Sequence, residues 1–172
     1  MSGGFPEPQG ILKLVSRVTG ARNSAPPGRV ARTMNREERF RDFFRRYALV
    51  SLGPEPEKLA DFYDTSFLAA GPKGGAAFRN DEDFLKWLRG VHEFNAKSGM
   101  TSMSAGTTDE TSISADYTLV TVEWAATFER TGETMLRFKI SYLLREFADG
   151  WKVAAYISHE DQEEAMRAHG LL

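Results

Sequence analysis

The stretch that decides the fold is YTLVTVEWAATF, residues 117–128, in which apolar and polar residues alternate. Successive side chains of a strand point to opposite faces, so this run has one apolar side. Its apolar side consists of Val120, Val122, Trp124, Ala126 and Phe128. The run LRFKISYLLR, residues 136–145, repeats the pattern, with an apolar side of Leu136, Phe138, Ile140, Tyr142 and Leu144. Two such strands joined by the turn RTGE indicate an antiparallel sheet with a buried face.

Helical patterns precede the strands. NREERFRDFFRRYALVSLG, residues 35–53, opens with Asn35 and has Glu38 three residues later, which is a capping-box pattern. PEPEKLADFYD, residues 54–64, predicts a short second helix with Pro54 in its first turn. RNDEDFLKWLRGVHEFNAKSG, residues 79–99, predicts a third helix capped by Asn80 or Asp81. Residues 100–158 then read as about four strands. Helices followed by antiparallel strands predict the α+β class.

Residues 1–34 form a separate segment, rich in Gly, Pro and Ser. They offer too little apolar surface to offset the entropy of ordering, so we expect a disordered tail. Two other interpretations stay open. Translation could begin at Met34, or the segment could be a targeting presequence, since it holds basic residues and almost no acids. The globular domain is expected to span residues 35–172.

Composition and charge exclude several classes of function. Residues 1–34 carry five basic residues and one acidic residue, so the formal net charge of −2 leaves −6 on the rest. An acidic domain argues against nucleic acid as the partner, because phosphate binding needs a basic surface. The chain has no cysteine, which excludes disulfides and thiol nucleophiles and fits a cytoplasmic protein. No apolar run reaches the length of a membrane span. We expect no membrane partner and no cofactor.

The order of these elements resembles the nuclear transport factor 2-like superfamily, and within it the ketosteroid isomerase and polyketide cyclase (SnoaL-like) branch. RRYALVSLG, residues 45–53, is similar to that family's first helix, and REFADGWKVAAYIS, residues 145–158, to its final hairpin. The resemblance implies a cone-shaped, curved antiparallel sheet wrapped around the long N-terminal helix. Two further helices and a short C-terminal helix complete it, with a pocket at the open end.

The same resemblance implies a homodimer that forms through the outer face of the sheet. Arg137, Lys139 and Arg145 lie opposite the apolar side of their strand and would suit a polar interface. One of these basic residues would face Glu123 of the neighbouring copy. A homodimer and a small apolar molecule are therefore the expected partners.

The family's isomerase chemistry does not carry over completely. Ketosteroid isomerases combine a carboxylate base with a Tyr and a protonated carboxylic acid that hold the oxyanion. Tyr47, by its position in the first helix, takes the Tyr role. The segment where the base belongs reads LAAGPKGG, residues 68–75, with no acid or His, and the third strand offers Ser141 and Tyr142 but no Asp. We therefore expect no isomerase activity.

His159, in AYISHEDQEE (residues 155–164), has two interpretations. In the first, Ser158 caps a short helix that ends at Gly170, and the acids after His159 complement the helix dipole. In the second, His159 points inward at the pocket mouth, because it shares strand parity with Val153 and Ile157, and acts as a general base. A metal site is not expected, since the zinc-protease pattern needs a second His where Glu163 stands.

The remaining candidates are aromatic. Tyr63, Trp87, Trp124 and Tyr142 are expected to line a ligand site together with Tyr47. Aromatics at these spacings also make ordinary cores, and that interpretation stays open. Buried Tyr hydroxyls need partners, which a polar ligand or water could supply.

Three functions remain open from the sequence. The domain could bind a small apolar or aromatic ligand in its cone, or it could be a dimerising interaction module. It could also be a SnoaL-like enzyme, such as a cyclase, dehydratase or hydrolase, that uses His159 and Tyr47 as acid/base groups. Whether it is an enzyme is left open, but ligand binding ranks first because the sequence shows no evident acid/base pair.

Overall fold

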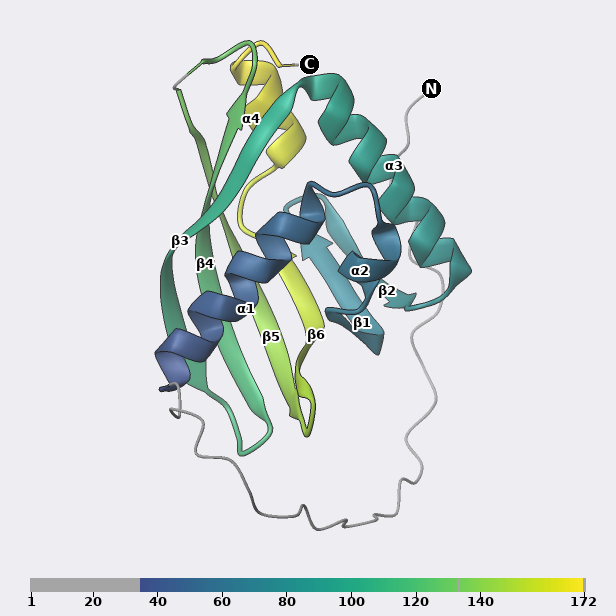
Figure 1. Cartoon of the computed structure of the whole chain (residues 1–172), viewed down its shortest axis with the longest axis vertical. Helices are drawn as coiled ribbons and strands as arrows, with labels where there is room; N and C mark the ends of the chain where they lie inside the picture. The colour runs from purple at the N-terminus through teal and green to yellow at the C-terminus, as the bar shows by residue number, and fades with distance from the viewer. Residues whose placement is uncertain (1–34, 133, 172) are drawn as a thin grey trace.

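The computed structural model describes residues 35–132 and 134–171 (Figure 1). Predictions about residues 1–34 lie outside this range. The elements follow in this order: α1 (Arg36–Ser51), α2 (Pro56–Ala60), β1 (Tyr63–Gly71), β2 (Gly74–Arg79), α3 (Glu82–Ser98), β3 (Met100–Ser112), β4 (Tyr117–Phe128), β5 (Leu136–Phe147), β6 (Gly150–Ser158) and α4 (Gln162–Ala168).

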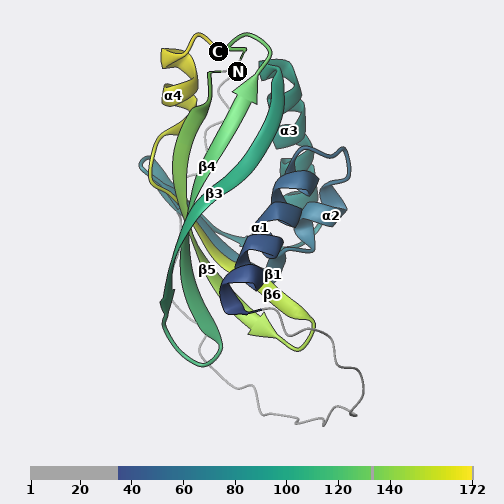
Figure 2. The same ribbon diagram turned by 60° about the vertical axis from the view of Figure 1, so that its left-hand side comes forward.

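The strands form one sheet in the order β2-β1-β6-β5-β4-β3. Neighbouring strands are antiparallel except for β1 and β6, which are parallel. The long strands bend strongly, and α1, α2 and α3 lie on one side of them (Figure 2). The predicted α+β fold, a curved sheet around a long N-terminal helix, is therefore confirmed. The sequence did not predict β2, whose residues GGAAFR carry no strong strand pattern.

Helix α1 begins where its capping pattern predicts. The Asn35 side chain accepts a hydrogen bond from the Glu38 backbone N–H, and the Glu38 side chain accepts one from the Asn35 N–H. One side of α1 is buried against the sheet. The ring of Phe40 stacks on Trp151 at 4.0 Å between centroids, and the ring of Phe44 packs against Tyr142 at 5.0 Å. Burying such a ring contributes roughly 1.5–3 kcal/mol, so this apolar side fixes α1 on the sheet.

We call the sheet face that packs against α1 the inner face and the opposite one the outer face. Strands β4 and β5 alternate as their sequences predict, with Val120 opposite Tyr142 and Trp124 opposite Phe138 on the inner face. Arg137 and Glu123 lie on the outer face and form an ion pair at 2.9 Å within the same chain. The expected contact with Glu123 of a neighbouring copy stays a prediction, and within the chain Glu123 pairs with Arg137.

A β-bulge in β6 changes which residues face inward. Leu144 lies opposite Val153 and Leu143 lies opposite Ala155, so Ala154 is an extra residue in this strand. An extra residue reverses the alternation of everything that follows it. Val153 is on the inner face, but the inner-face residue after the bulge is Tyr156, and Ile157 is on the outer face.

Two helix starts differ from the sequence predictions. Helix α4 is capped by Asp161, whose side chain accepts from the Glu164 N–H, and not by Ser158. Ser158 is the last residue of β6, and its hydroxyl donates to the Glu160 carbonyl. Helix α2 starts at Pro56 and not at Pro54. Within the described residues, no helix combines the length and apolarity needed to span a bilayer.

Candidate functional site

Five elements bring aromatic side chains with polar atoms together inside the fold. Tyr47 comes from α1, Tyr63 from β1, Trp124 from β4, Tyr142 from β5 and Tyr156 from β6. We call these five residues the tyrosine cluster. The Tyr47 ring is in contact with three of the others, at centroid distances of 6.2 Å to Tyr63, 5.9 Å to Trp124 and 5.8 Å to Tyr142. A packed aromatic interior with several hydroxyls is the main chemical feature of this side of the sheet.

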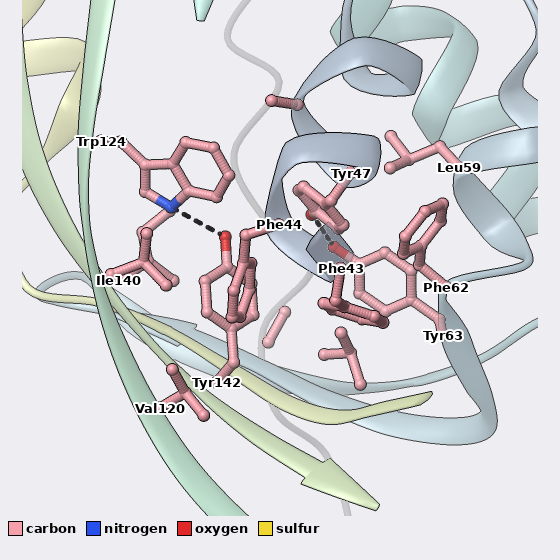
Figure 3. Close-up of a cluster of buried hydrophobic side chains, with 14 of the residues drawn as sticks. Phe43, Phe44, Tyr47, Leu59, Phe62, Tyr63, Val120, Trp124, Ile140 and Tyr142 are labelled. Atoms are coloured by element: carbon pink, nitrogen blue, oxygen red, sulfur yellow. Dashed lines mark hydrogen bonds between the residues drawn. The ribbon is translucent and has the colours of Figure 1, made fainter. Parts of the chain in front are cut away.

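Hydrogen bonds join four of these side chains in two pairs, which lie on opposite sides of the interior (Figure 3). The hydroxyl oxygens of Tyr47 and Tyr63 are 2.6 Å apart. On the other side, the indole Nε1 of Trp124 donates to the Tyr142 hydroxyl at 3.1 Å. The predicted residues Tyr47, Tyr63, Trp124 and Tyr142 are thus brought together, each with a partner inside the protein.

These tyrosines stay protonated. Burial raises the pKa of Tyr47, Tyr63 and Tyr142 well above the ordinary value of 10.0, because the interior disfavours the phenolate. Burial also raises the pKa of Tyr156. A neutral phenol donates or accepts a hydrogen bond, but it does not serve as a base at neutral pH. The cluster can therefore bind and orient polar atoms, and it is poorly suited to removing protons.

Tyr156 is the site residue that sequence reasoning missed. Its hydroxyl accepts a hydrogen bond from Nε2 of Gln162 at 3.1 Å, at the start of α4. It is partly exposed at the edge of the buried cluster, and burial still raises its pKa. Met103 and Ala105, which lie on the inner face of β3 opposite Ala126 and Trp124, are also partly exposed. The inner face is therefore fully buried beneath α1 and less covered near β3 and Tyr156.

His159 lies on the outer face, away from Tyr47. Its Nε2 is 2.7 Å from the hydroxyl oxygen of Ser141, which is in turn 2.7 Å from that of Thr121. The expectation that His159 shares the inward parity of Val153 is wrong, because the bulge at Ala154 reverses the alternation between them. The structure therefore does not bring His159 together with Tyr47.

Trp87 also differs from its expected interior position. It is 40% exposed on α3, where its ring stacks on Phe84 at 5.9 Å and lies 6.0 Å from Phe78 of β2. Phe84 and Leu88 are the buried residues of this part of α3, at 2% and 4% exposure. Trp87 covers the rings of Phe78 and Phe84 on the side toward solvent, and it does not join the tyrosine cluster.

Comparison with known proteins identifies the family. Residues 36–161 match a protein family described as "NTF2-like protein (DUF6841)". This match covers most of the domain, including every strand and the first three helices. The chain belongs to this NTF2-like family. Among curated protein sequences, none matches the chain.

Solved structures share the fold of this NTF2-like protein at low sequence identity. An NTF2-like protein with a cystatin-like fold from Novosphingobium aromaticivorans has 16% identity and a TM-score of 0.59, covering 79% of this chain and 88% of that one. A domain of unknown function with a cystatin-like fold from Nostoc punctiforme has 12% identity, a TM-score of 0.58 and coverages of 80% and 86%. A ketosteroid isomerase-like protein from Erwinia carotovora atroseptica has 20% identity, a TM-score of 0.53 and coverages of 73% and 97%.

In the described residues of this NTF2-like domain, the hydrogen bonds of the tyrosine cluster involve neutral groups, namely phenol hydroxyls, one indole, the Gln162 amide and the Ser158 hydroxyl. The same part of the chain contains no group of three or more His, Asp and Glu side chains placed to hold a metal ion. The geometry therefore supports ligand recognition by neutral hydrogen bonds.

The NTF2-like domain also has a surface groove that the sequence did not indicate. It has a volume of about 410 Å³ and lies between α1, α2 and the start of β6. Phe43, Leu49, Phe62 and Trp151 contribute apolar surface to it. Its basic side chains already have partners, as shown by the 3.0 Å ion pair of Arg46 with Asp42. The groove thus combines apolar surface with charged side chains of both signs, among them Asp61, Asp149 and Lys152.

Proposed function

We propose that this NTF2-like domain binds a small apolar or aromatic molecule between the inner face of the sheet and its helices. The observation that carries the proposal is that Tyr156, Met103 and Ala105 on the inner face are only partly covered, whereas the tyrosines that pack next to Tyr156 are buried. Small-molecule sites are lined mostly by apolar side chains with a few placed polar groups, and these residues offer that combination.

A pair of matched variants tests the position of the site. Ala105 lies directly opposite Trp124 on the inner face, whereas Ser104 lies on the outer side of the same strand and is exposed. Ala105→Phe would place a ring on the less covered part of the inner face, and Ser104→Phe would add the same ring on the outer face. Both changes have the same chemistry, so they differ only in the face of the sheet that they alter.

The experiment is a thermal-shift screen of the full chain against steroids, terpenoids, aromatic polyketides and fatty acids. A ligand that binds the folded state raises the melting temperature in proportion to its affinity and concentration. We expect one chemical class to raise it in the wild type and in Ser104→Phe, and to lose that effect in Ala105→Phe. A shift that survives in Ala105→Phe would place binding elsewhere, and the proposal would fail.

The enzyme alternative requires His159 and Tyr47 to act on one substrate. Tyr47 is buried beneath the inner face with a raised pKa, and His159 is hydrogen-bonded to Ser141 on the outer face. Two groups on opposite faces of one sheet cannot contact the same reacting atoms. Ligand binding without this acid/base pair is therefore the function that we propose.

A second function concerns the outer face, which we propose as an interface between two copies of the chain. An apolar row crosses this face where Leu68 lies opposite Ala155, Ala155 opposite Leu143 and Leu143 opposite Leu119. Leu68 is 41% exposed, and the nearby Ile157 is 40% exposed. Leu119 and Leu143 are partly exposed and Ala155 is buried, so the exposed apolar surface is concentrated at Leu68 and Ile157. Exposed apolar side chains that lie close together are typical of a surface that another protein covers.

Analytical ultracentrifugation of the full chain tests this second proposal. We expect a dimer in the wild type and a monomer in Leu68→Glu, because a charge at the row would be buried without a partner. Leu49→Glu is the matched control, since Leu49 is 64% exposed on α1 and outside the row. It should leave the dimer intact. A wild-type monomer at high protein concentration would overturn the proposal.

A further inference from the structure

Helix α3 lies along one side of the domain (Figure 1), next to β2, which is an edge strand of the sheet. Trp87, Val91 and Phe94 recur on this helix at spacings of four and three, so they lie along one side of it. Trp87 and Phe94 are each 40% exposed, and Val91 is partly exposed. Beside its buried residues Phe84 and Leu88, α3 therefore presents an apolar row to solvent.

A second row of residues runs beside the apolar row and is charged. Its members recur at spacings of three and four and are all exposed: Asp83, Lys86, Gly90, Glu93 and Lys97. Asp83 and Lys97 have opposite charges and lie seven residues before and after Gly90. Lys86 and Glu93 also have opposite charges and lie four residues before and three residues after it. The charges at matching distances from Gly90 are therefore opposite in sign.

This order of charges is complementary to itself when the helix is reversed. A two-fold axis brings the same surface of two copies together, and two helices related by an axis perpendicular to them are antiparallel. With the axis at Gly90, Asp83 of one copy would lie near Lys97 of the other. Lys86 of one copy would likewise lie near Glu93 of the other. A parallel pair would place like charges beside each other, so the charges favour an antiparallel second copy.

Gly90 fits the crossing point of such a pair. Glycine in the interior of a helix is about 1 kcal/mol less favourable than alanine. Packing against the described residues does not account for it, because a Cβ at this position would meet nothing within 4 Å beyond its own stretch of helix. The distance between two packed helices depends on the side chains at their contact, so a glycine there lets them approach closely. Trp87 of each copy would then cover Phe94 of the other.

We propose that α3 associates with α3 of a second copy of the chain in an antiparallel pair centred on Gly90. This contact lies at the β2 edge of the domain and is separate from the outer-face interface proposed above. One pair of helices buries less area than a stable dimer needs, so we expect a weak contact that forms at high protein concentration. Outer-face dimers would then join through α3 into larger assemblies.

Single cysteines introduced into the full chain test this register, because the chain has no cysteine of its own. Gly90→Cys places a thiol at the centre of the contact, so mild oxidation of a concentrated solution should give a covalent dimer on a denaturing gel. Asp83→Cys and Lys97→Cys should each give little dimer alone, whereas a mixture of the two should cross-link. Ala96→Cys is the control for random collision, since Ala96 is exposed on α3 outside both rows.

Charge reversal tests recognition between the two helices. Lys86→Glu and Glu93→Lys each place like charges opposite each other and should weaken the association roughly fivefold. The double variant restores opposite charges and should recover the wild-type affinity, which a loss of folding would not allow. Sedimentation equilibrium in the Leu68→Glu background measures the α3 contact alone. Far-UV circular dichroism checks the helix, because Lys86→Glu also removes the exposed ion pair with Asp83.

The outcomes separate the α3 contact from other uses of the apolar row. If Gly90→Cys does not cross-link at high concentration, another molecule or another part of the chain covers the row, and the inference is overturned. Cross-linking of Ala96→Cys to the same extent, or of Asp83→Cys alone as fully as the mixture, would overturn the antiparallel register. Loss of the Gly90→Cys dimer in the Leu68→Glu background would show that α3 is not a separate interface.

Discussion

The hydroxyl oxygens of Tyr47 and Tyr63 are 2.6 Å apart, and both rings are buried. The bond joins the last full turn of α1 to the first residue of β1, so it fixes the helix relative to the strand that follows it. It also satisfies two hydroxyls that would otherwise be costly to bury. The pair is thus a structural element of the cone as well as part of the candidate site.

The first prediction concerns how this pair contributes to stability. Tyr47→Phe or Tyr63→Phe breaks the hydrogen bond between the two hydroxyls, so each single variant should lower the free energy of unfolding by about 1–3 kcal/mol. Removing both hydroxyls leaves neither group unsatisfied. The double variant should therefore cost clearly less than the sum of the two single variants. Urea denaturation of the wild type and the three variants gives the coupling free energy between the two hydroxyls. Additive losses of unfolding free energy would contradict the prediction.

The second prediction concerns alkaline pH. Tyr47, Tyr63, Tyr142 and Tyr156 have raised pKa values in the folded state, so the folded protein keeps protons that the unfolded chain loses above about pH 10.0. Their contribution to stability is complete below pH 10.0 and is lost as the pH rises through their folded-state pKa values. Each such tyrosine should steepen the fall in unfolding free energy by about 1.4 kcal/mol per pH unit.

Denaturation at a series of alkaline pH values measures this slope. Tyr142→Phe removes one of these tyrosines. Its unfolding free energy should therefore fall less steeply with pH than that of the wild type, by about 1.4 kcal/mol per pH unit. Phenolate absorbance from the cluster should appear together with the loss of near-UV circular dichroism. Phenolate formation in a protein that keeps its near-UV spectrum would show that these hydroxyls are accessible, contrary to the prediction.

The fold could be predicted from the sequence because its strongest patterns are local. The alternation of apolar and polar residues in β4 and β5 predicts the inner-face residues correctly, and the Asn35–Glu38 pattern predicts the start of α1. The bulge at Ala154 could not be predicted, because bulges depend on the register between strands and not on one strand's residues. That single residue explains why His159 was expected on the wrong face and why Tyr156 was overlooked.

Exposure was also hard to predict where helices cover the sheet. Trp87 and Leu88 are neighbours on α3, and both fit the apolar pattern of the helix, yet Trp87 is 40% exposed and Leu88 is 4% exposed. The periodic pattern of a helix shows which side of the helix a residue is on, but it does not show how deeply that residue is buried. How deeply each residue is buried depends on where β2 and Phe78 lie, and the residues of β2 carry no strong strand pattern.

The third prediction tests the capping box of α1. Asn35→Ala removes the acceptor for the Glu38 backbone N–H and should lower the free energy of unfolding by about 1 kcal/mol. Asn35→Ser is the control, because Ser is also a preferred cap and should retain most of the stability. Urea denaturation of the full chain compares the two. Equal losses in both variants would mean that something other than the cap hydrogen bond is responsible.

The fourth prediction separates the two faces of the sheet by function. His159→Ala removes a contact to Ser141, whose hydroxyl keeps Thr121 as a partner, so stability should change by less than about 1 kcal/mol. The melting-temperature rise caused by an active compound of the ligand screen should be the same in His159→Ala as in the wild type. Tyr156→Phe should reduce it, because that hydroxyl lies in the less covered part of the inner face.

The pH dependence of that ligand effect gives an independent check. Histidine titrates near neutral pH and the cluster tyrosines do not, so ligand-induced stabilisation should be constant between pH 6 and pH 8, a range that spans the ordinary histidine pKa of about 6.5. If stabilisation varied over this range and the variation disappeared in His159→Ala, the outer face would be coupled to the ligand site. The separation of His159 from the site would then be wrong as an account of function, and the acid/base alternative would regain its main residue.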